Sequence, residues 1–175
     1  MKALIIGRFQ PLHLGHVDLI EKTSSLGFDE IIIGVGSNGF KITEKYPFTF
    51  DEVKGMLKDT LKISVRIFEI PDIEDDRDYA EHVERITGCN SNDTKLVSGN
   101  AHTIECFTKY SRQYPVIKPG LDFPLQHEKL SATLIRSYMN DGGYWYNYVP
   151  KPVYEKLKRL HGVARIKESY YAKAN

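Results

Sequence analysis

Apolar residues gather along the chain in short continuous runs and in segments with helical spacing. The run Glu30–Gly36 is apolar on both faces, which is typical of a strand inside a parallel sheet. The continuous runs predict strands at residues 3–6, 30–36, 63–70, 95–99 and 115–117. Helical spacing predicts helices at residues 16–25, 49–61, 78–87, 101–112, 131–140 and 152–160.

Local signals mark several of the expected helix ends. Thr49 and Glu52 have the spacing of a capping box, which starts the second helix. Pro152 suits the first turn of the last helix, and Gly162 is expected to close it. The tail Ile166–Asn175 is expected to be a loosely held end or a contact for another subunit.

Strands that alternate with helices over short connections favour a parallel α/β sheet with helices on both faces. The sequence carries no internal repeat, low-complexity segment or linker-like stretch. We therefore expect residues 1–175 to form a single domain, with a C-terminal helical region from about residue 144.

Composition disfavours nucleic-acid-binding, disulfide-bonded and membrane proteins. Because 24 Lys and Arg balance 23 Asp and Glu, the formal net charge is +1, and a nucleic-acid partner is not expected. The two cysteines, Cys89 and Cys106, fit a reduced cytoplasmic protein, and because neither belongs to a C-x-x-C pair, a role in metal binding or redox chemistry is not expected. No apolar stretch approaches the roughly 20 residues of a membrane span. The chain enters a strand directly rather than a signal peptide, so we expect a soluble, cytoplasmic protein without a membrane partner.

The segment between the first strand and the first helix carries the first candidate chemistry. Gly7 lets the backbone turn tightly, and the helix start that follows offers unpaired N–H groups to phosphate. Arg8 adds a planar cation, and His13 and His16 are spaced to face one ligand. This pattern favours a phosphate site, and the H-x-x-H pair leaves open two ligands of a metal.

A second candidate cluster, of the form S-x-T-x-x-R, follows late in the chain. Ser131 and Thr133 stand at an expected helix start, where hydroxyls and free N–H groups bind phosphate oxygens. Arg136 follows within reach, and its fork can hold two such oxygens. The alternative is a capped helix with one surface arginine.

Both clusters resemble known signatures. His13–His16 is similar to the (H/T)xGH motif of the nucleotidylyltransferase superfamily, and Leu130–Arg136 to its (I/L/V)S(A/S/G)TxxR motif. The longer form Gly7–His16 resembles archaeal-type nicotinamide mononucleotide (NMN) adenylyltransferases. Further similar segments span nearly the whole chain: Tyr46–Thr49, Val97–Asn100, Asp141–Trp145, Val149–Pro150 and Gly162–Ile166.

The resemblance implies a Rossmann-like nucleotidylyltransferase fold, with a parallel five-stranded sheet in the order 3-2-1-4-5. It implies transfer of AMP from ATP to NMN, giving NAD and pyrophosphate, with Mg²⁺ accompanying ATP and no metal ligand from protein side chains. It also implies a homo-oligomer, typically a hexamer in archaeal members.

The resemblance also assigns residues. Catalytic roles fall on Arg8, His13, His16 and Arg136. The implied ATP-binding residues are Gly7, Arg8, Phe9, Gln10, His13, Gly15, His16, Ser98, Gly99, Asn100, Ser131, Thr133 and Arg136. The implied NMN-binding residues are Ser37, Lys45, Phe48, Asp72, Ile73 and Tyr79. Tyr79 stands where the family has a stacking Trp, although its helical spacing equally suits a packed helix residue.

The chain departs from the family pattern around the Pro-Phe-Thr segment. Lys41, Ile42 and Lys45 replace a Ser-His pair and an Arg, and Val53 replaces an Arg. Lys45 keeps a charge without the bidentate grip of arginine. These departures leave other acceptors open: nicotinic acid mononucleotide, flavin mononucleotide or phosphopantetheine. The alternative outside the enzymes is a non-catalytic nucleotide sensor with the same fold.

Overall fold

The computed structural model describes residues 1–39, 41–110 and 112–174, with side chains up to residue 171. The chain divides into two compact units, each treated by itself below. The sheet unit comprises residues 1–7, 19–36 and 63–126. The helical unit comprises residues 8–18, 37–62 and 127–175.

The strands form one five-stranded sheet in the predicted order, β3-β2-β1-β4-β5. β1 pairs in parallel with β2 on one side and β4 on the other, and β4 pairs in parallel with β5. This confirms the Rossmann-like arrangement. The strands are β1 (Lys2–Gly7), β2 (Glu30–Ser37), β3 (Arg66–Pro71), β4 (Thr94–Val97) and β5 (Val116–Ile117).

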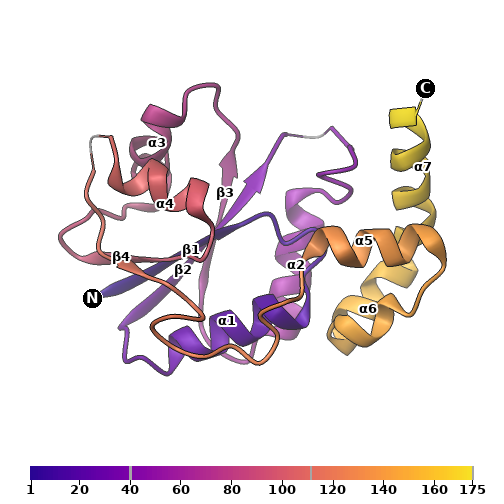
Figure 1. Ribbon diagram of the computed structural model, residues 1–175, viewed down its shortest axis with the longest axis horizontal. Helices are drawn as coiled ribbons and strands as arrows, with labels where there is room; N and C mark the ends of the chain where they lie inside the picture. Colours follow the sequence, from indigo (N-terminus) through magenta and orange to yellow (C-terminus); the bar gives the residue numbers. More distant parts are fainter. Residues whose placement is uncertain (40, 111, 175) are drawn as a thin grey trace. The chain divides into compact units, whose positions relative to one another are not determined.

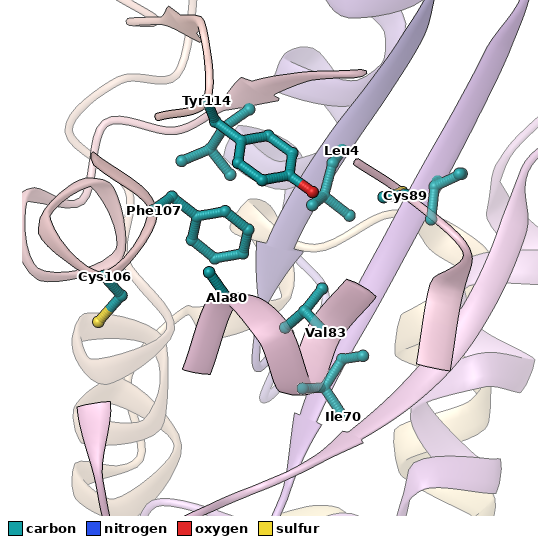
Figure 2. Packing of buried hydrophobic residues seen from close by; sticks show 10 residues of the cluster. Leu4, Ile70, Ala80, Val83, Cys89, Cys106, Phe107 and Tyr114 are labelled. Atoms are coloured by element: carbon teal, nitrogen blue, oxygen red, sulfur yellow. The ribbon is translucent and has the colours of Figure 1, made fainter. Parts of the chain in front are cut away.

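One face of the sheet carries the main apolar core. Leu4 pairs with Ile32 and with Leu96 in register, so the three side chains share a face. They join a fully buried cluster with Ala80, Val83 and Phe107 of the covering helices (Figure 2). The continuous apolar runs predicted such two-sided burial, and Ala3 and Ile5 are also buried.

Helices cover the sheet on both sides. α3 (Tyr79–Thr87) and α4 (Ala101–Thr108) lie on one side and α1 (Leu14–Ser24) on the other (Figure 1). A short 3-10 helix, η1 (Asp76–Asp78), leads into α3. α4 ends at Thr108, before the predicted residue 112, and the Phe107 carbonyl accepts the Tyr114 N–H at 3.1 Å. Residue 111 of the predicted helix lies outside the described residues.

The helical unit begins its second helix as the sequence predicts. Thr49 accepts from the Glu52 N–H at 3.3 Å, and Glu52 accepts from the Thr49 N–H at 2.9 Å, which completes the capping box. The helices of this unit are α2 (Phe50–Thr60), α5 (Ala132–Asp141), η2 (Trp145–Tyr148), α6 (Lys151–Arg159) and α7 (Gly162–Ala174).

The C-terminal tail differs from the expectation of a loose end. It forms α7, which starts at Gly162 instead of stopping there. His161 takes the left-handed turn between α6 and α7, with φ of 51°. A Cβ on Gly162 would lie 3.2 Å from the Leu157 carbonyl oxygen, so the glycine permits the close start of α7. No helix among the described residues has the length and apolar character to cross a membrane.

Candidate active site

Two histidines close the first motif on itself at the start of α1. The His13 N–H donates to Nδ1 of His16 at 3.4 Å, and the His16 N–H donates to Nδ1 of His13 at 3.3 Å. The two rings stack with centroids 3.6 Å apart. The pair therefore caps the helix reciprocally, as a Thr–Glu capping box does.

These bonds favour one position for the ring proton. A neutral imidazole has one acceptor nitrogen and one N–H donor. The His16 N–H also donates to the His13 carbonyl at 2.9 Å, and Nδ1 of each ring faces a backbone N–H, which favours the neutral tautomer with its proton on Nε2. Each ring therefore offers an Nε2–H donor for a ligand.

Burial keeps both imidazoles neutral near pH 7. Desolvation, and then the nearby His127, lowers the pKa of His13 to about 4. Desolvation, and then His13, holds the pKa of His16 well below its ordinary value. The motif thus presents neutral hydrogen-bond donors.

Gly15 allows a distant loop to approach the motif. A Cβ at this position would lie 2.9 Å from the His127 carbonyl oxygen and 3.1 Å from the His13 ring. The His127 N–H donates in turn to the Asp18 carboxylate of α1 at 3.1 Å. The central glycine is therefore required by the close approach of two segments of the helical unit.

Gln10 links the first motif to the Pro-Phe-Thr segment. Its Nε2 donates to the Phe48 carbonyl at 2.8 Å, and its Oε1 accepts from the Phe48 N–H at 2.9 Å. Phe9, just before it, has a left-handed φ of 53° and a buried ring 4.8 Å from the His16 ring. The amide of Gln10 is thus engaged with backbone, which suits a positioning role.

Arg136 brings the second motif against the first. Its Nη1 donates to the Gln10 backbone carbonyl at 2.8 Å, across 126 residues of sequence. Its Nη2 donates to Oγ1 of Thr133 at 3.3 Å. The arginine is only 5% exposed, so the alternative of a surface arginine on a capped helix is wrong. Ser131 does cap α5, since it accepts from the Leu134 N–H at 3.2 Å.

The surroundings of Arg136 suit an anion. Among the described residues its Nε is buried without a hydrogen-bond partner. Burial is the main cause that lowers the pKa of Arg136, and the positive charge of Arg8 lowers it further; Tyr170, whose oxygen accepts a hydrogen bond from the guanidinium, and the negative charge of Glu44 act in the opposite direction. Arg8 itself is exposed, with its guanidinium 5.7 Å from the Tyr46 ring centroid. A phosphate group would satisfy the orphaned Nε–H and offset the two neighbouring cations.

The remaining expected site residues fall in both units. In the helical unit, Ser37 and Phe48 are buried and Lys45 is exposed. The sheet unit contains Asp72, Ile73, Tyr79, Ser98, Gly99 and Asn100, together with Gly7. Asn100 caps α4 through its side chain, which accepts from the Thr103 N–H at 2.9 Å.

Tyr79 packs as a helix residue. Its ring lies edge-on to Phe107, with centroids 6.1 Å apart, against the core cluster. Desolvation, and then Asp72, raises the pKa of its hydroxyl to about 12. The packed position is therefore observed, and the stacking of a nicotinamide ring stays a prediction.

Sequence reasoning missed three residues that shape the site. His127 and Asp18 hold the loop that crosses Gly15, and Tyr170 reaches Arg136 from α7. No spacing rule connects positions 127 or 170 to the motifs, because these contacts arise from tertiary packing. The one signal in the sequence that could have drawn attention to His127 is its position three residues before the second motif, Leu130–Arg136.

Comparison with known proteins places the chain in a family. The Cytidylyltransferase-like family model matches residues 4–137. A protein from Methanococcus maripaludis, named nicotinamide-nucleotide adenylyltransferase, is 36% identical over 169 residues, covering 95% of this chain and 94% of its own. A protein of the same name from Thermococcus onnurineus is 34% identical over 171 residues, covering 95% of this chain and 87% of its own.

A solved structure is similar in fold. It is a bifunctional NMN adenylyltransferase/ADP ribose pyrophosphatase from Francisella tularensis, complexed with AMP and a Mn ion. The TM-score is 0.71 at 21% identity, and the match covers 96% of this chain and about half, 51%, of that one. The sequence relatives carry the assignment further than fold: this chain belongs to the nicotinamide-nucleotide adenylyltransferase family of cytidylyltransferase-like proteins.

Proposed function

We propose that this protein transfers the AMP moiety of ATP to nicotinamide mononucleotide, forming NAD and pyrophosphate. The observation that carries the proposal is the hydrogen bond from Arg136 to the Gln10 carbonyl, which joins the two phosphate-binding motifs in one compact unit. The activity named for the sequence relatives supports the choice of substrates.

The chemistry needs no general base. The 5′-phosphate of NMN is already an anion at neutral pH and attacks the α-phosphorus of ATP, while the bond to the β-phosphate oxygen breaks and pyrophosphate leaves. The barrier is lowered by alignment and by stabilisation of charge on the α-phosphate and the leaving group. The reaction therefore requires fixed hydrogen-bond donors and cations around the α-phosphate and the leaving pyrophosphate.

The helical unit supplies such donors. His13 and His16 donate from Nε2 to the triphosphate and to the pentavalent transition state. Arg8 and Arg136 hold the β- and γ-phosphates, with the orphaned Nε of Arg136 as one donor. The start of α5 at Ser131 and Thr133 completes the phosphate cradle.

We propose Mg²⁺ as the accompanying metal. Arg8, His13, His16, Ser131, Thr133 and Arg136 include no carboxylate, the ligand that Mg²⁺ prefers from proteins. The cation would therefore be held by the phosphates of ATP and would share their charge with the two arginines.

The acceptor side rests on the residues that the family resemblance assigned. We propose that Ser37, Lys45, Phe48, Asp72, Ile73 and Tyr79 bind NMN, and that Gly7, Phe9, Gln10, Gly15, Ser98, Gly99 and Asn100 complete the ATP site. Val53, one of the departures from the family, is fully buried in α2. Lys41, Ile42 and Lys45 are exposed, so an altered acceptor preference would arise there.

We also propose that residues 1–175 act as one domain, since the chain passes between the two units five times and neither unit is a continuous piece. We also propose a homo-oligomer, which the strongly exposed Tyr144 and Tyr171 of the helical unit support. The family resemblance suggests a hexamer as the specific case. Light scattering on the purified protein measures that state directly. We propose a cytoplasmic location, which the two free cysteines fit, and no nucleic-acid partner, which the net charge of +1 fits.

A product assay tests the reaction. Purified protein is incubated with ATP, Mg²⁺ and one acceptor: NMN, nicotinic acid mononucleotide, flavin mononucleotide or phosphopantetheine. We expect pyrophosphate and NAD in equal amounts with NMN, and the highest kcat/KM for that acceptor. A different preferred acceptor would reassign the substrate, and ATP binding without pyrophosphate release would identify a nucleotide sensor.

A charge-conserving variant tests the proposed clamp. Arg136→Lys keeps the positive charge and loses the planar fork. We expect kcat/KM for ATP to fall by at least about tenfold, the size of a lost charge-assisted hydrogen bond. The exposed Arg159→Lys in α6 is the matched control, and equal effects of the two changes would contradict the clamp.

A further inference from the structure

A second group of chemically active side chains lies in the sheet unit. Asp76 of η1 and His102 and Cys106 of α4 each offer one ligand atom, and these three atoms lie within 4.8 Å of one another. The Asp76 carboxylate oxygen is 3.5 Å from Nε2 of His102. His102 and Cys106 stand four residues apart, so they share one face of the helix.

The burial of this group is asymmetric. Cys106 is 2% exposed, whereas Asp76 and His102 are exposed above it. Figure 2 shows the Cys106 sulfur turned away from the Phe107 ring. The buried thiol therefore lies within 4.8 Å of the ligand atoms of two exposed polar side chains.

The distances suit a small metal ion. Tetrahedral bonds of about 2.0–2.3 Å to oxygen, nitrogen and sulfur place ligand atoms about 3.4–3.6 Å apart. The Asp76–His102 pair already has that separation. The Cys106 sulfur lies within 4.8 Å of both of these atoms, so metal binding requires the exposed Asp76 and His102 side chains to rotate toward it.

The local charge also favours a cation. The Asp76 carboxylate lies beside the Cys106 thiol and attracts a divalent ion, and a bound ion would stabilise the thiolate. A proton then leaves as the metal–sulfur bond forms.

We propose that Asp76, His102 and Cys106 form a binding site for a thiolate-preferring divalent metal of the Zn²⁺ class. The set of one sulfur, one nitrogen and one oxygen ligand excludes Mg²⁺ as the preferred ion and leaves a fourth position for water. Such an ion ties η1 to α4 through Asp76, three residues before Tyr79 begins α3. None of these three residues is among those proposed to bind ATP or NMN, and the proposal does not depend on the proposed reaction.

Cobalt binding in the absence of nucleotide tests the site. Co²⁺ replaces Zn²⁺ and reports a thiolate ligand by a sulfur-to-cobalt charge-transfer band in the near ultraviolet. We titrate Co²⁺ into the full chain after removing metals with a chelator, and then displace it with Zn²⁺ or with Mg²⁺. We expect one Co²⁺ per chain with the charge-transfer band, displaced by equimolar Zn²⁺ and retained in excess Mg²⁺.

Variants assign the ligands. We expect Cys106→Ser to abolish the band, and His102→Ala and Asp76→Asn to weaken Co²⁺ binding by more than about tenfold, since even outer-shell partners are worth that much. His82→Ala, at a partly exposed histidine of α3 outside the cluster, is the matched control and should bind as the wild type does. Because His102 and Asp76 are exposed, their variants keep the test valid if Cys106→Ser does not fold.

The proposal is overturned if the wild-type protein shows no charge-transfer band, or if the band persists in Cys106→Ser, which would assign it to Cys89. Equal weakening by His82→Ala and His102→Ala would also overturn it. Circular dichroism of each variant without metal verifies that the fold is intact.

Discussion

At the level of single residues, His13 and His16 have two functions. Nδ1 of each ring accepts a backbone N–H, which caps the start of α1, and Nε2–H remains as the donor to a ligand. Burial keeps both rings neutral, and a neutral donor gains most when negative charge develops on the oxygen that it binds. This favours stabilisation of the transition state over tight binding of ATP.

The first prediction concerns His16→Ala. We expect kcat to fall about 10²- to 10³-fold, the usual cost of one lost donor to a developing oxyanion. The dissociation constant for ATP should change far less, because ground-state binding is shared with the arginines. Steady-state kinetics and calorimetric ATP binding measure the two effects. Equal losses in both quantities would contradict a role specific to the transition state.

The low pKa of His13 predicts a pH-dependent stability. In the unfolded chain the imidazole has its ordinary pKa of 6.5, and in the folded chain it has a pKa of about 4. Between these values the unfolded chain binds more protons, so the free energy of unfolding decreases as pH falls. The contribution of His13 is about 3 kcal/mol. Urea unfolding at pH 6.5 and pH 4 measures the change, and His16 adds to it in the same direction.

The control for this effect is His13→Asn, which removes the titrating group. We expect the stability loss between pH 6.5 and pH 4 to shrink by about 3 kcal/mol in this variant. The carboxyl groups of Asp75 and Asp93, with pKa values of about 2, act mostly below this window. An unchanged loss in the variant would show that His13 is not the group responsible.

At the level of elements, the site depends on a helix that hydrophobic spacing did not reveal. α7 packs against α5, the helix that carries Arg136, and Tyr170 hydrogen-bonds that arginine. Arg165 donates to Glu52 at 2.7 Å and to the Pro47 carbonyl at 3.2 Å. α7 therefore links the second motif, the capping box of α2 and the Pro-Phe-Thr segment.

Ile166 is the buried anchor of α7, at 0% exposure. We expect Ile166→Ala to lower the free energy of unfolding by about 2–5 kcal/mol, through lost burial and the cavity that remains. ATP binding should weaken as well, since α5 loses its support. Glu168→Ala, an exposed change on the same helix, should stay within about 0.5 kcal/mol of the wild type. A stable Ile166→Ala protein with normal ATP affinity would refute this role of α7.

The elements also show where sequence reasoning succeeds. Strands β1 and β2 and the capping box of α2 follow from local patterns, and the structure confirms them. α7 was missed because Gly162 normally stops a helix, whereas here His161 makes the left-handed turn and Gly162 starts the next helix. That choice depends on the packing of α7 against α5 and α6, which no local spacing encodes.

At the scale of the whole molecule, the two motifs could be named from the sequence but their contact could not be derived from it. The hydrogen bond between Arg136 and the Gln10 carbonyl spans 126 residues and needs the turn at Phe9 to present that carbonyl. The orphaned Nε of Arg136 is likewise visible only in the folded chain. Family resemblance predicted that the motifs act together, and the geometry of the helical unit supplies the physical reason.

The interleaved chain path predicts cooperative unfolding. α1 runs from Leu14 to Ser24, and the boundary between the units falls within it, after Asp18. Because helix formation is cooperative, half of so short a helix is not stable alone, so loss of either unit removes an element of the other. We therefore expect both units to unfold in a single transition.

Intrinsic probes can follow each unit separately. Trp145, the only tryptophan, is 8% exposed in the helical unit, and Cys89 and Cys106, the only cysteines, are buried in the sheet unit. We expect tryptophan fluorescence and thiol labelling to give the same urea midpoint, with a chelator present so that bound metal does not protect Cys106. Cys106→Ala, followed through Cys89 alone, controls for local opening near the proposed metal site. Two separated midpoints would mean that the units are independent folding domains, because a shared helix cannot then be limiting the stability of both.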